Sequence, residues 1–461
     1  MITPESALLT QLRKMEAGTT PLKSLKDTEL MVAYSGGLDS SVLLHASVQL
    51  LNAGKIAKLS VLHVNHGISP DADEWQKHCQ QTCDNYKISL LSTKFELAQR
   101  WTTSEADARE ARYSFFEQCV NDQQVLLFAH HQDDQAETVL FRLFRGSGIH
   151  GVSGMPRVRR FSSGYLLRPF LEFTKSELES FAKLDQLSWV EDDSNASSRY
   201  SRNYIRNEIL PLLKNKWPEV TPSISRFAKI ANDQMEILDE TAQQDLVQVQ
   251  IDKNRLDIAK LHELSFARQN NLLHFWIRAY GENSPSSLDI EQILNQISVV
   301  GSQQENINDQ KIEIKVAGVW LRCFDGKLFM LKRDEPQVLT ERLLWQDIGR
   351  NFRINKDIVL VVTSASSLES ANKNLCLRLP TSQEIVTVRA RTGGEKAKPS
   401  YRNHSTNLKT IYQELKIPSW QREWLPLIYF NEKLVAVPGV FVDQSVVDEK
   451  GIELSIRLAE R

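Results

Sequence analysis

ELMVAYSGGLDSS, residues 29–41, joins an apolar strand-like run to the start of a helical pattern through two adjacent glycines. Residues 29–35 have the character of a buried strand, and residues 38–51 place apolar side chains at helical spacing. Gly36 and Gly37 have no Cβ, so backbone N–H groups can come close to an anion. The helix that follows directs its positive end at the same place. The segment therefore predicts a phosphate-binding loop between a strand and a helix.

Polar side chains extend this predicted loop. Ser35, Ser40 and Ser41 would add hydroxyl donors. Asp39 would repel a phosphate unless a divalent cation lay between them, so we interpret Asp39 as a Mg²⁺ anchor. The alternative is a tight Gly-Gly turn followed by a helix cap, but the whole hexapeptide in this strand-to-helix context favours nucleotide binding. The loop also lacks the lysine with which kinases and GTPases hold the β- and γ-phosphates.

Strand-like and helix-like segments alternate from this loop to about residue 211. Strands are expected at residues 58–66, 88–95 and 125–130, and helices at residues 104–120 and 133–145. This rhythm predicts an α/β fold in which a Rossmann-like parallel sheet has helices on both faces. Ligands of such sheets bind outside the carboxyl ends of the strands, which is where the candidate residues fall.

The pattern changes near Pro211, and three domains are expected. Residues 1–215 would form the catalytic α/β domain. Residues 216–338 would form a central, mostly helical domain that ends in short alternating strands. Residues 339–461 would form a small α+β domain with one helix near residues 408–415. We find no internal repeat and no low-complexity tract.

The composition is that of a globular protein. Of the 461 residues, 41% are apolar and 25% are charged, and the formal net charge is −2. A net charge near zero argues against a protein whose whole surface binds nucleic acid, although local basic patches can still bind phosphate. No apolar run approaches the roughly 18 residues of a membrane span, and the amino-terminal residues lack the apolar core of a signal peptide. A cytoplasmic protein with no membrane partner is expected, and homodimer formation is left open.

The five cysteines are scattered along the chain. Cys79 and Cys83 lie four residues apart, as on one face of a helix, but no second pair completes a metal site. Thiols in a reducing compartment, without a metal, are the favoured interpretation.

A cluster of acids follows the last of the expected strands. His130 and His131 precede Asp133, Asp134 and Glu137 at the start of a helix. Asp133 and Glu137 share a helix face, and Asp134 lies three residues from Glu137. Acids in a first turn also complement the helix dipole. Three carboxylates beside a nucleotide loop nevertheless favour the binding of a cation, which is either Mg²⁺ or a substrate ammonium.

Basic residues gather at two further places. Arg109 and Arg112 lie three residues apart on one expected helix face, which is either a solvated surface or a contact with the phosphates of ATP or RNA. Arg199, Arg202 and Arg206 alternate with the neighbouring tyrosines, and this mixture suits contacts with phosphates and bases.

These blocks resemble a known family. SGGLDS is similar to the signature of the PP-loop family of N-type ATP pyrophosphatases, whose members split ATP between its α- and β-phosphates and form an adenylated intermediate. The order of the other blocks resembles the tRNA(Ile)-lysidine synthetase branch of that family, densely over residues 28–212 and again from residue 391. The remaining matching blocks are residues 145–148, 168–169, 192–195, 391–394, 396, 398, 408–409, 418–422 and 426–427.

The resemblance implies an enzyme that modifies the wobble cytidine in the CAU anticodon of tRNA(Ile). ATP would activate the C2 oxygen of the base as an adenylate. The ε-amine of free L-lysine would then attack C2, and AMP would leave. The codon and charging identity of the tRNA would thereby change from methionine to isoleucine. The central and C-terminal domains would reach along the tRNA.

The same resemblance implies roles for the residues near ATP. The pyrophosphate portion of ATP would be held by Ser35, Gly36, Gly37, Leu38, Ser40 and Ser41. Asp39, with Asp133 as a second candidate, would hold Mg²⁺. Arg109 and Arg112 would neutralise charge on the phosphates.

For the amino-acid substrate, the resemblance implies that Asp134 and Glu137 contact lysine. They would bind it and help to deprotonate it, because a free ε-amine with a pKa of about 10.4 is almost wholly protonated at neutral pH. His130 would support either step. Arg202 and Arg206 would meet the anticodon region.

Three alternatives stay open. A tRNA 2-thiolation enzyme shares the loop and the substrate class, but such enzymes need paired cysteines, usually CxxC, and the chain has no such pair. A small-molecule synthetase of the same fold usually carries a glutaminase domain or an ammonia partner, and no N-terminal nucleophilic cysteine is visible. A non-catalytic tRNA-binding module would not need an intact SGGLDS loop and the acidic cluster.

Overall fold

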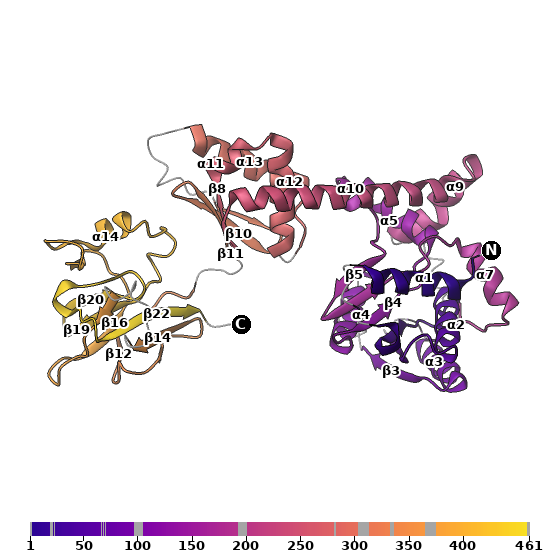
Figure 1. Cartoon of the computed structure of the whole chain (residues 1–461), viewed down its shortest axis with the longest axis horizontal. Helices are drawn as coiled ribbons and strands as arrows, with labels where there is room; N and C mark the ends of the chain where they lie inside the picture. The colour runs from indigo at the N-terminus through magenta and orange to yellow at the C-terminus, as the bar shows by residue number, and fades with distance from the viewer. Residues whose placement is uncertain are drawn as a thin grey trace. The chain divides into compact units, whose positions relative to one another are not determined.

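Figure 1 shows the computed structural model, which describes residues 2–18, 22, 24–65, 67, 69, 71–95, 105–191, 201–280, 283–302, 313–331, 336–364 and 375–458. The chain forms two compact units, Met1–Thr241 and Ala242–Arg461. Parts of the predictions lie outside the described residues, namely His66, Ser104, Asp192, Asp193, Ser194, Asn195, Arg199 and Tyr200.

The first unit is built on a six-stranded sheet in the order β3-β2-β1-β4-β6-β5. Five strands are parallel, and only the edge strand β5 runs antiparallel to its neighbour. The bounds are β1 Glu29–Ala33, β2 Lys58–Asn65, β3 Ser89–Lys94, β4 Gln124–Leu127, β5 Val158–Phe161 and β6 Gly164–Leu167. The predicted parallel sheet is confirmed.

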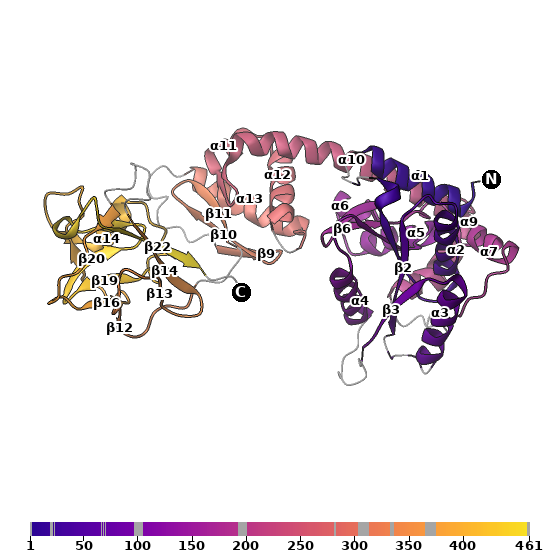
Figure 2. The same ribbon diagram turned by 60° about the horizontal axis from the view of Figure 1, so that its bottom comes forward.

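Helices connect these strands and cover both faces of the sheet. Figure 2 shows α4 on one side of β3, with α2 and α3 on the other. The helix α1 begins at Pro4, after Thr3, whose side chain accepts the Ser6 N–H. The helices that surround the sheet are α1 Pro4–Ala17, α2 Leu38–Asn52, α3 Ala72–Tyr86, α4 Glu105–Cys119, α5 Gln132–Phe144, α6 Ile149–Val152 and α7 Lys175–Leu184.

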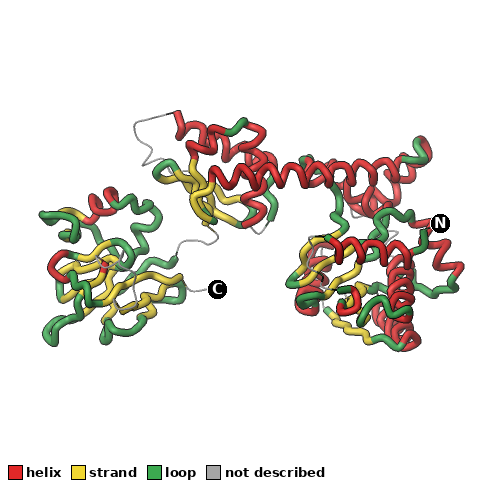
Figure 3. The backbone as a smooth tube through the Cα atoms, in the orientation of Figure 1, coloured by secondary structure: helices red, strands yellow, loops and turns green. Residues whose placement is uncertain are grey.

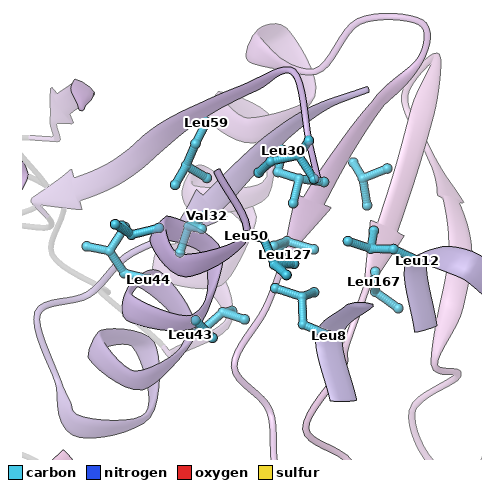
Figure 4. Close-up of a cluster of buried hydrophobic side chains, with 14 of the residues drawn as sticks. Leu8, Leu12, Leu30, Val32, Leu43, Leu44, Leu50, Leu59, Leu127 and Leu167 are labelled. Carbon is cyan, nitrogen blue, oxygen red and sulfur yellow. The ribbon is translucent and has the colours of Figure 1, made fainter. Parts of the chain in front are cut away.

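The core of this unit lies in two layers because successive residues of a strand face opposite sides of the sheet. Leu30 and Val32 of β1 belong to the cluster that includes Leu8 and Leu12 of α1 and the leucines of α2 (Figure 4). Met31 belongs to a second cluster with residues of α4. Both faces exclude water, which explains the continuous apolar character of β1 and β4.

The predicted elements of the first unit are confirmed, with small shifts at their ends. The strand expected at residues 125–130 ends at Leu127, and the helix expected at residues 133–145 spans Gln132–Phe144. Sequence patterns do not predict the β5–β6 hairpin. Its strands have four residues each, too few to establish a period.

The second unit begins within the long helix α10, Val220–Val249. Its first part combines helices with an antiparallel sheet in the order β7-β8-β11-β10-β9, and helices predominate there as predicted for the central domain (Figure 3). Trp276 and Ile277 of α12 share a core cluster with Leu321 of β10. The further bounds are α11 Ile258–Glu263, α12 Phe266–Tyr280, α13 Ser287–Ser302, β7 Gln250–Asp252, β8 Arg255–Asp257, β9 Glu313–Val316, β10 Val319–Phe324 and β11 Lys327–Leu331.

The remaining part of the second unit consists mainly of strands and loops (Figure 3), as predicted for a small α+β domain. One sheet is ordered β12-β16-β19-β20-β21, and another is ordered β13-β14-β22-β15. The strand bounds are β12 Leu343–Leu344, β13 Phe352–Arg353, β14 Ile358–Ser364, β15 Cys376–Leu377, β16 Val386–Arg389, β17 Lys396–Ala397, β18 Thr406–Asn407, β19 Leu427–Phe430, β20 Lys433–Val437, β21 Phe441–Val442 and β22 Ile452–Leu458. The helix α14 spans Leu408–Glu414, where a helix was expected.

Within the ranges that the structure describes, no helix is both long and apolar enough to cross a bilayer.

Candidate active site

The candidate site lies at the carboxyl edge of the sheet in the first unit. β1 has β2 on one side and β4 on the other, so the chain reverses its direction across the sheet at this point. Such a reversal opens a crevice at the carboxyl ends of the strands. The glycine loop follows β1, His130 and His131 follow β4, and Arg168 follows β6. The topology thus gathers three segments that are distant in the sequence.

Gly36 has a backbone conformation and surroundings that only glycine fits. Its φ of +86° lies in the left-handed region. An added Cβ would lie 3.0 Å from Val190 Cγ2 and 3.1 Å from Cys79 Sγ. The Gly36 carbonyl accepts the Val190 N–H at 2.9 Å. Cys79 therefore serves as a packing residue beneath the loop.

The start of α2 forms the open side of the loop. Leu38 is its first residue, and Gly37 at the N-cap position has no side chain that could accept the N–H groups of the first turn. Ser40 Oγ and Ser41 Oγ donate to the Gly37 carbonyl at 2.9 and 3.1 Å, and Ser35 Oγ lies 3.1 Å from Ser40 Oγ. The serines thus fix the shape of the loop beside a positive helix end. The Leu38 side chain packs against the core, so its backbone is the part that suits a ligand.

Asp39 has one carboxylate oxygen with a partner and one without. Its Oδ2 lies 3.5 Å from His131 Nε2. Its Oδ1 is buried and has no hydrogen-bond partner within the described ranges. A buried carboxylate oxygen without a donor is costly, and a bound cation would satisfy it. Asp39 therefore fits the predicted role of a Mg²⁺ anchor.

A Mg²⁺ ion at Asp39 would take most of its ligands from the bound nucleotide and from water. No group of three or more His, Cys, Asp or Glu side chains in the described part of the chain could hold a metal ion. Mg²⁺ in nucleotide sites usually takes one or two carboxylates and completes its shell with phosphates and water.

His131 joins the loop to the acids of α5. Its Nε2 lies 3.5 Å from Asp39 Oδ2 and 3.4 Å from Asp134 Oδ2, and its Nδ1 lies 3.7 Å from Asp133 Oδ2. Burial alone would lower the pKa of His131, but the three carboxylates outweigh burial and raise this pKa to about 9. His131 is therefore a cation at neutral pH and holds three acids of like charge together.

Asp134 and Glu137 are buried on α5 and bind a guanidinium of the same chain. Arg206 donates to Glu137 Oε1 at 2.6 Å, to Glu137 Oε2 at 2.8 Å and to Asp134 Oδ1 at 3.0 Å. Arg202 Nε donates to Glu137 Oε2 at 3.4 Å. Burial would raise the pKa of Asp134, but the charges of His131 and Arg206 are among those that lower it. The two carboxylates together hold a cation.

Local helix geometry positions the two arginines. The helix α8, Ser201–Tyr204, continues through a π-helical turn at Ile205–Ile209 into α9, Leu210–Lys216. Ile205 and Leu210 pack against Ala136 and Leu140 of α5. A π-helical turn is uncommon and occurs often at functional sites. This packing keeps α8 and α9 beside the acids of α5.

Asp133, the second candidate for a metal ligand, has protein partners for both oxygens. Its Oδ1 pairs with Lys214 Nζ at 2.5 Å, and its Oδ2 accepts the Lys175 N–H at 3.1 Å. These contacts link α5 to α9 and α7. A role for Asp133 in metal binding stays a prediction.

His130 is a neutral residue beside this cluster. Its ring stacks on Phe128 with centroids 5.3 Å apart and planes at 15°. Arg168 Nε donates to His130 Nδ1 at 3.3 Å, which leaves the ring proton on Nε2. Burial, against the opposing charge of Asp134, lowers the pKa of His130 to about 3. At neutral pH His130 is a hydrogen-bond donor and a poor base.

The two arginines of α4 have different surroundings. Arg109 Nη2 donates to Tyr113 OH at 3.0 Å, and Arg109 lines a cavity together with Arg168. Arg112 lies nearer β2, where burial and then the charge of Arg112 lower the pKa of His63. Arg109 and Arg112 therefore lie in different parts of the crevice, although they are only three residues apart.

The structure therefore brings Asp39, Asp134 and Glu137 into one cluster with Arg202 and Arg206. Sequence reasoning assigned no role to His131, which is the central cation of this cluster. The signal for His131 was its place directly before the acids. Arg168 reaches His130 across 38 residues of chain, and sequence patterns give no indication of that contact.

Three family models match the chain. They are the PP-loop domain at residues 9–213, the TilS substrate binding domain at residues 256–329 and the TilS substrate C-terminal domain at residues 386–458. The PP-loop match contains the glycine loop and the whole cluster described above.

Curated relatives are similar to the chain over nearly its full length. It is 37% identical to the tRNA(Ile)-lysidine synthase of Coxiella burnetii (strain RSA 493 / Nine Mile phase I), covering 91% of the chain and 92% of that protein. It is 35% identical to the tRNA(Ile)-lysidine synthase of Serratia proteamaculans (strain 568), covering 90% and 92%. The enzyme of the same name from Proteus mirabilis (strain HI4320) is 34% identical, covering 90% and 91%.

Proposed function

Since the chain belongs to the tRNA(Ile)-lysidine synthase family, we propose that it uses ATP to adenylate the wobble cytidine of the CAU anticodon and then transfers free L-lysine to C2 of that base. It is an ATP-using enzyme that forms lysidine on tRNA(Ile). The assignment of residues rests on one series of contacts. His131 contacts both Asp39 and Asp134, and Arg206 contacts both Asp134 and Glu137. They join a nucleotide loop to a pair of carboxylates that binds cations.

The first step needs the phosphates of ATP to be held while the C2 oxygen of cytidine attacks the α-phosphorus. We assign this task to the backbone of Gly36, Gly37 and Leu38. The hydroxyls of Ser35, Ser40 and Ser41 would add donors once Ser40 and Ser41 turn from the Gly37 carbonyl to the phosphates. The N–H groups at a helix start carry partial positive charge toward the anion. The bond between the α- and β-phosphates breaks, and pyrophosphate leaves with charge that the loop stabilises.

Mg²⁺ is assigned to Asp39. The support is the buried Oδ1 of Asp39, which has no donor within the described ranges. When bound, the cation would neutralise charge on the polyphosphate. Asp133 is the weaker candidate because both of its oxygens already have partners.

The second step needs an uncharged lysine ε-amine, and a free amine with a pKa of about 10.4 is protonated at neutral pH. We propose that the ε-ammonium takes the place of the Arg206 guanidinium on Asp134 and Glu137, and that one of these carboxylates accepts its proton. The amine then attacks C2. The C2–N bond forms as the bond between C2 and the adenylate oxygen breaks, and AMP leaves.

His130 suits a different task from proton removal. Because its pKa is about 3, the neutral ring cannot compete for an ammonium proton at neutral pH. Its Nε2–H suits a hydrogen bond to the RNA or to the leaving AMP. His130 is therefore assigned to positioning of the substrate.

The rest of the tRNA is assigned to the other parts of the chain. Arg202 and Arg206 lie at the acids and are proposed to meet the anticodon region when RNA binds. The regions matching the substrate binding domain and the substrate C-terminal domain are proposed to contact the tRNA beyond the anticodon. Domain boundaries near residues 215 and 338 stay predictions.

The thiolation alternative is disfavoured by the state of the thiols. Cys79 and Cys83 are buried, and burial raises the pKa of each thiol to about 12. Sulfur transfer needs a reactive thiolate. Cys79 also packs against Gly36, which gives it a structural task.

The proposal is tested by identifying the nucleotide products. The full chain is incubated with ATP, Mg²⁺, L-lysine and a tRNA(Ile) transcript that carries CAU. AMP and pyrophosphate are expected in equal amounts, and omission of the RNA should abolish both. Formation of ADP would contradict the mechanism, and absence of any ATP conversion would indicate a non-catalytic RNA-binding protein.

The same assay tests the magnesium assignment. Asp39→Asn is expected to raise the Mg²⁺ concentration for half-maximal AMP formation by about tenfold, because an amide oxygen carries no net charge. Asp133→Asn is the matched control and should leave that concentration unchanged, since its carboxylate is bound to Lys214. Equal shifts in the two variants would contradict the assignment to Asp39.

A further inference from the structure

A cavity of ≈ 490 Å³ lies on the α4 side of the first unit, next to the candidate active site. Its walls come from α4, from α5, from the segment before β5, from β5 itself and from the residue after β6. Its lining includes Arg109, Glu110, Tyr113, Arg142, Arg159 and Arg168. This volume is in the range of small-molecule sites, so the cavity can hold more than a single inorganic anion.

The lining of this cavity carries a large excess of positive charge. Four arginines face a single acid, Glu110, which is exposed. Within the described ranges, none of the four guanidiniums has a carboxylate within salt-bridge distance. Arginines gathered without acids repel one another, and such a site attracts an anion.

Neutral groups orient these guanidiniums instead. Arg142 Nη1 donates to the carbonyls of Gly151 and Gly154 at 2.9 and 2.7 Å. Arg168 Nη1 donates to the Pro156 carbonyl at 2.7 Å. Arg159 lies over the rings of Tyr113 and Phe161, at 5.6 and 5.4 Å from their centroids.

These contacts fix the arginines in place without cancelling their charge. Burial, with smaller contributions from neighbouring arginines, lowers the pKa of Arg168 to about 10. The pKa of Arg142 is lowered in the same sense, by burial first and then by Arg109 and Arg202. A positively charged site whose arginines are oriented by uncharged groups is typical of phosphate recognition.

Two contacts connect the cavity to the reacting groups. Arg168, which is 3% exposed, donates to His130 Nδ1 at 3.3 Å. Tyr113 stacks on Phe128 with centroids 5.8 Å apart and planes at 17°, and Phe128 in turn stacks on His130. His130 lies beside Asp134, whose charge acts on its pKa. His130 thus lies between the cavity and the carboxylates assigned to lysine.

We propose that this cavity binds the RNA backbone next to the wobble cytidine, with Arg109, Arg159 and Arg168 on its phosphodiester. The proposal rests on the proposed function, which supplies an RNA substrate with its reacting base at the carboxylate cluster. The phosphates of ATP are assigned to the glycine loop, whereas this cavity is formed with α4 and β5. Arg109 is accordingly an RNA contact rather than an ATP contact.

Arg159 and Arg160 provide a matched pair of variants. Both are exposed residues of β5, and neighbouring side chains of a strand face opposite sides. Arg159 lines the cavity. Arg160 lies over Tyr165 and donates to the Ser163 carbonyl at 3.1 Å. Unlike Arg142 and Arg168, Arg159 donates to no backbone carbonyl among the described residues, so its replacement should leave the fold intact.

The test measures the affinity of the full chain for a labelled anticodon stem–loop RNA that carries CAU. Arg159→Ala is expected to weaken binding about tenfold or more and to reduce the slope of log affinity against log salt by about one. The KM for tRNA should rise accordingly, while the KM values for ATP and lysine stay unchanged. Arg160→Ala should bind the RNA like the unchanged protein.

Equal effects of Arg159→Ala and Arg160→Ala would overturn the proposal, since only general surface charge would then matter. A raised KM for ATP with unchanged RNA affinity would also overturn it and would assign the cavity to ATP. The binding assay needs no turnover. A chain that forms no lysidine but loses RNA affinity on Arg159→Ala would therefore contradict the proposed function and support the cavity assignment.

Discussion

Replacing Gly36 with alanine is expected to lower kcat/KM for ATP by about 10²–10³-fold, the scale of losing preorganised donors to a developing anion. The new Cβ would lie 3.0 Å from Val190 Cγ2 and 3.1 Å from Cys79 Sγ, and the φ of +86° would be strained. The loop must shift to relieve both, and its N–H groups then no longer point at the phosphates. Rates of AMP formation at varied ATP concentration measure the effect.

Gly54→Ala is the matched control for this variant. Gly54 also has a positive φ, +62°, but an added Cβ meets nothing within 4 Å. It follows α2 at the opposite end of that helix from the glycine loop. Gly54→Ala should lose roughly 1 kcal/mol of stability and keep its activity. Full activity in Gly36→Ala, or an equal loss in both variants, would show that the loop does not hold ATP.

Replacing Glu137 with glutamine is expected to lower the lysine-dependent rate by about 10²-fold or more while leaving the KM for ATP unchanged. Glu137 is 1% exposed, and its two oxygens accept hydrogen bonds from Arg206 at 2.6 and 2.8 Å. An amide keeps the shape but loses the charge that an ammonium needs, and losing one partner of a buried charge pair costs about 2–5 kcal/mol. Steady-state kinetics at varied lysine concentration measure the change.

The same substitution leaves Arg206 without its closest carboxylate, so stability is expected to fall as well. The double variant Glu137→Gln with Arg206→Gln removes both charges. It should recover thermal stability without recovering the use of lysine. Recovery of both would mean that Glu137 and Arg206 are only a structural ion pair, and a raised KM for ATP in Glu137→Gln would place Glu137 at the nucleotide.

The fold class and the glycine loop could be predicted from the sequence because both are encoded locally. The run at residues 29–41 contains a buried strand, two glycines and a helix start within one short stretch. Alternating strands and helices then imply a parallel sheet, and such sheets carry their sites at the carboxyl ends. The acids of α5 can be predicted by the same reasoning, since α5 is the helix that follows β4 in the chain.

The partners of these residues could not be predicted, because they are distant in the sequence. Arg206 reaches Glu137 across 69 residues, and Lys214 reaches Asp133 across 81. Arg168 arrives at His130 only because β6 pairs with β4. Periodicity reports which face of an element is apolar, but it does not report which element will lie opposite.

Pairs of like residues that are close in the sequence show the same limit. His130 and His131 are identical in type, yet one has a pKa of about 3 and the other a pKa of about 9. Burial acts on both, but only His131 is surrounded by three carboxylates. Arg109 and Arg112 likewise share a predicted helix face and have different neighbours in the fold. Tertiary contacts decide these roles.

The most direct test is whether lysine becomes covalently attached to the RNA, because this reaction needs both the glycine loop and the acids of α5. The full chain is incubated with labelled L-lysine, ATP, Mg²⁺ and a tRNA(Ile) transcript that carries CAU, and a methionine tRNA with the same anticodon is the control. Label should appear on the wobble cytidine of tRNA(Ile) and not on the methionine tRNA. An unlabelled tRNA(Ile), with every component supplied, would contradict the assignment.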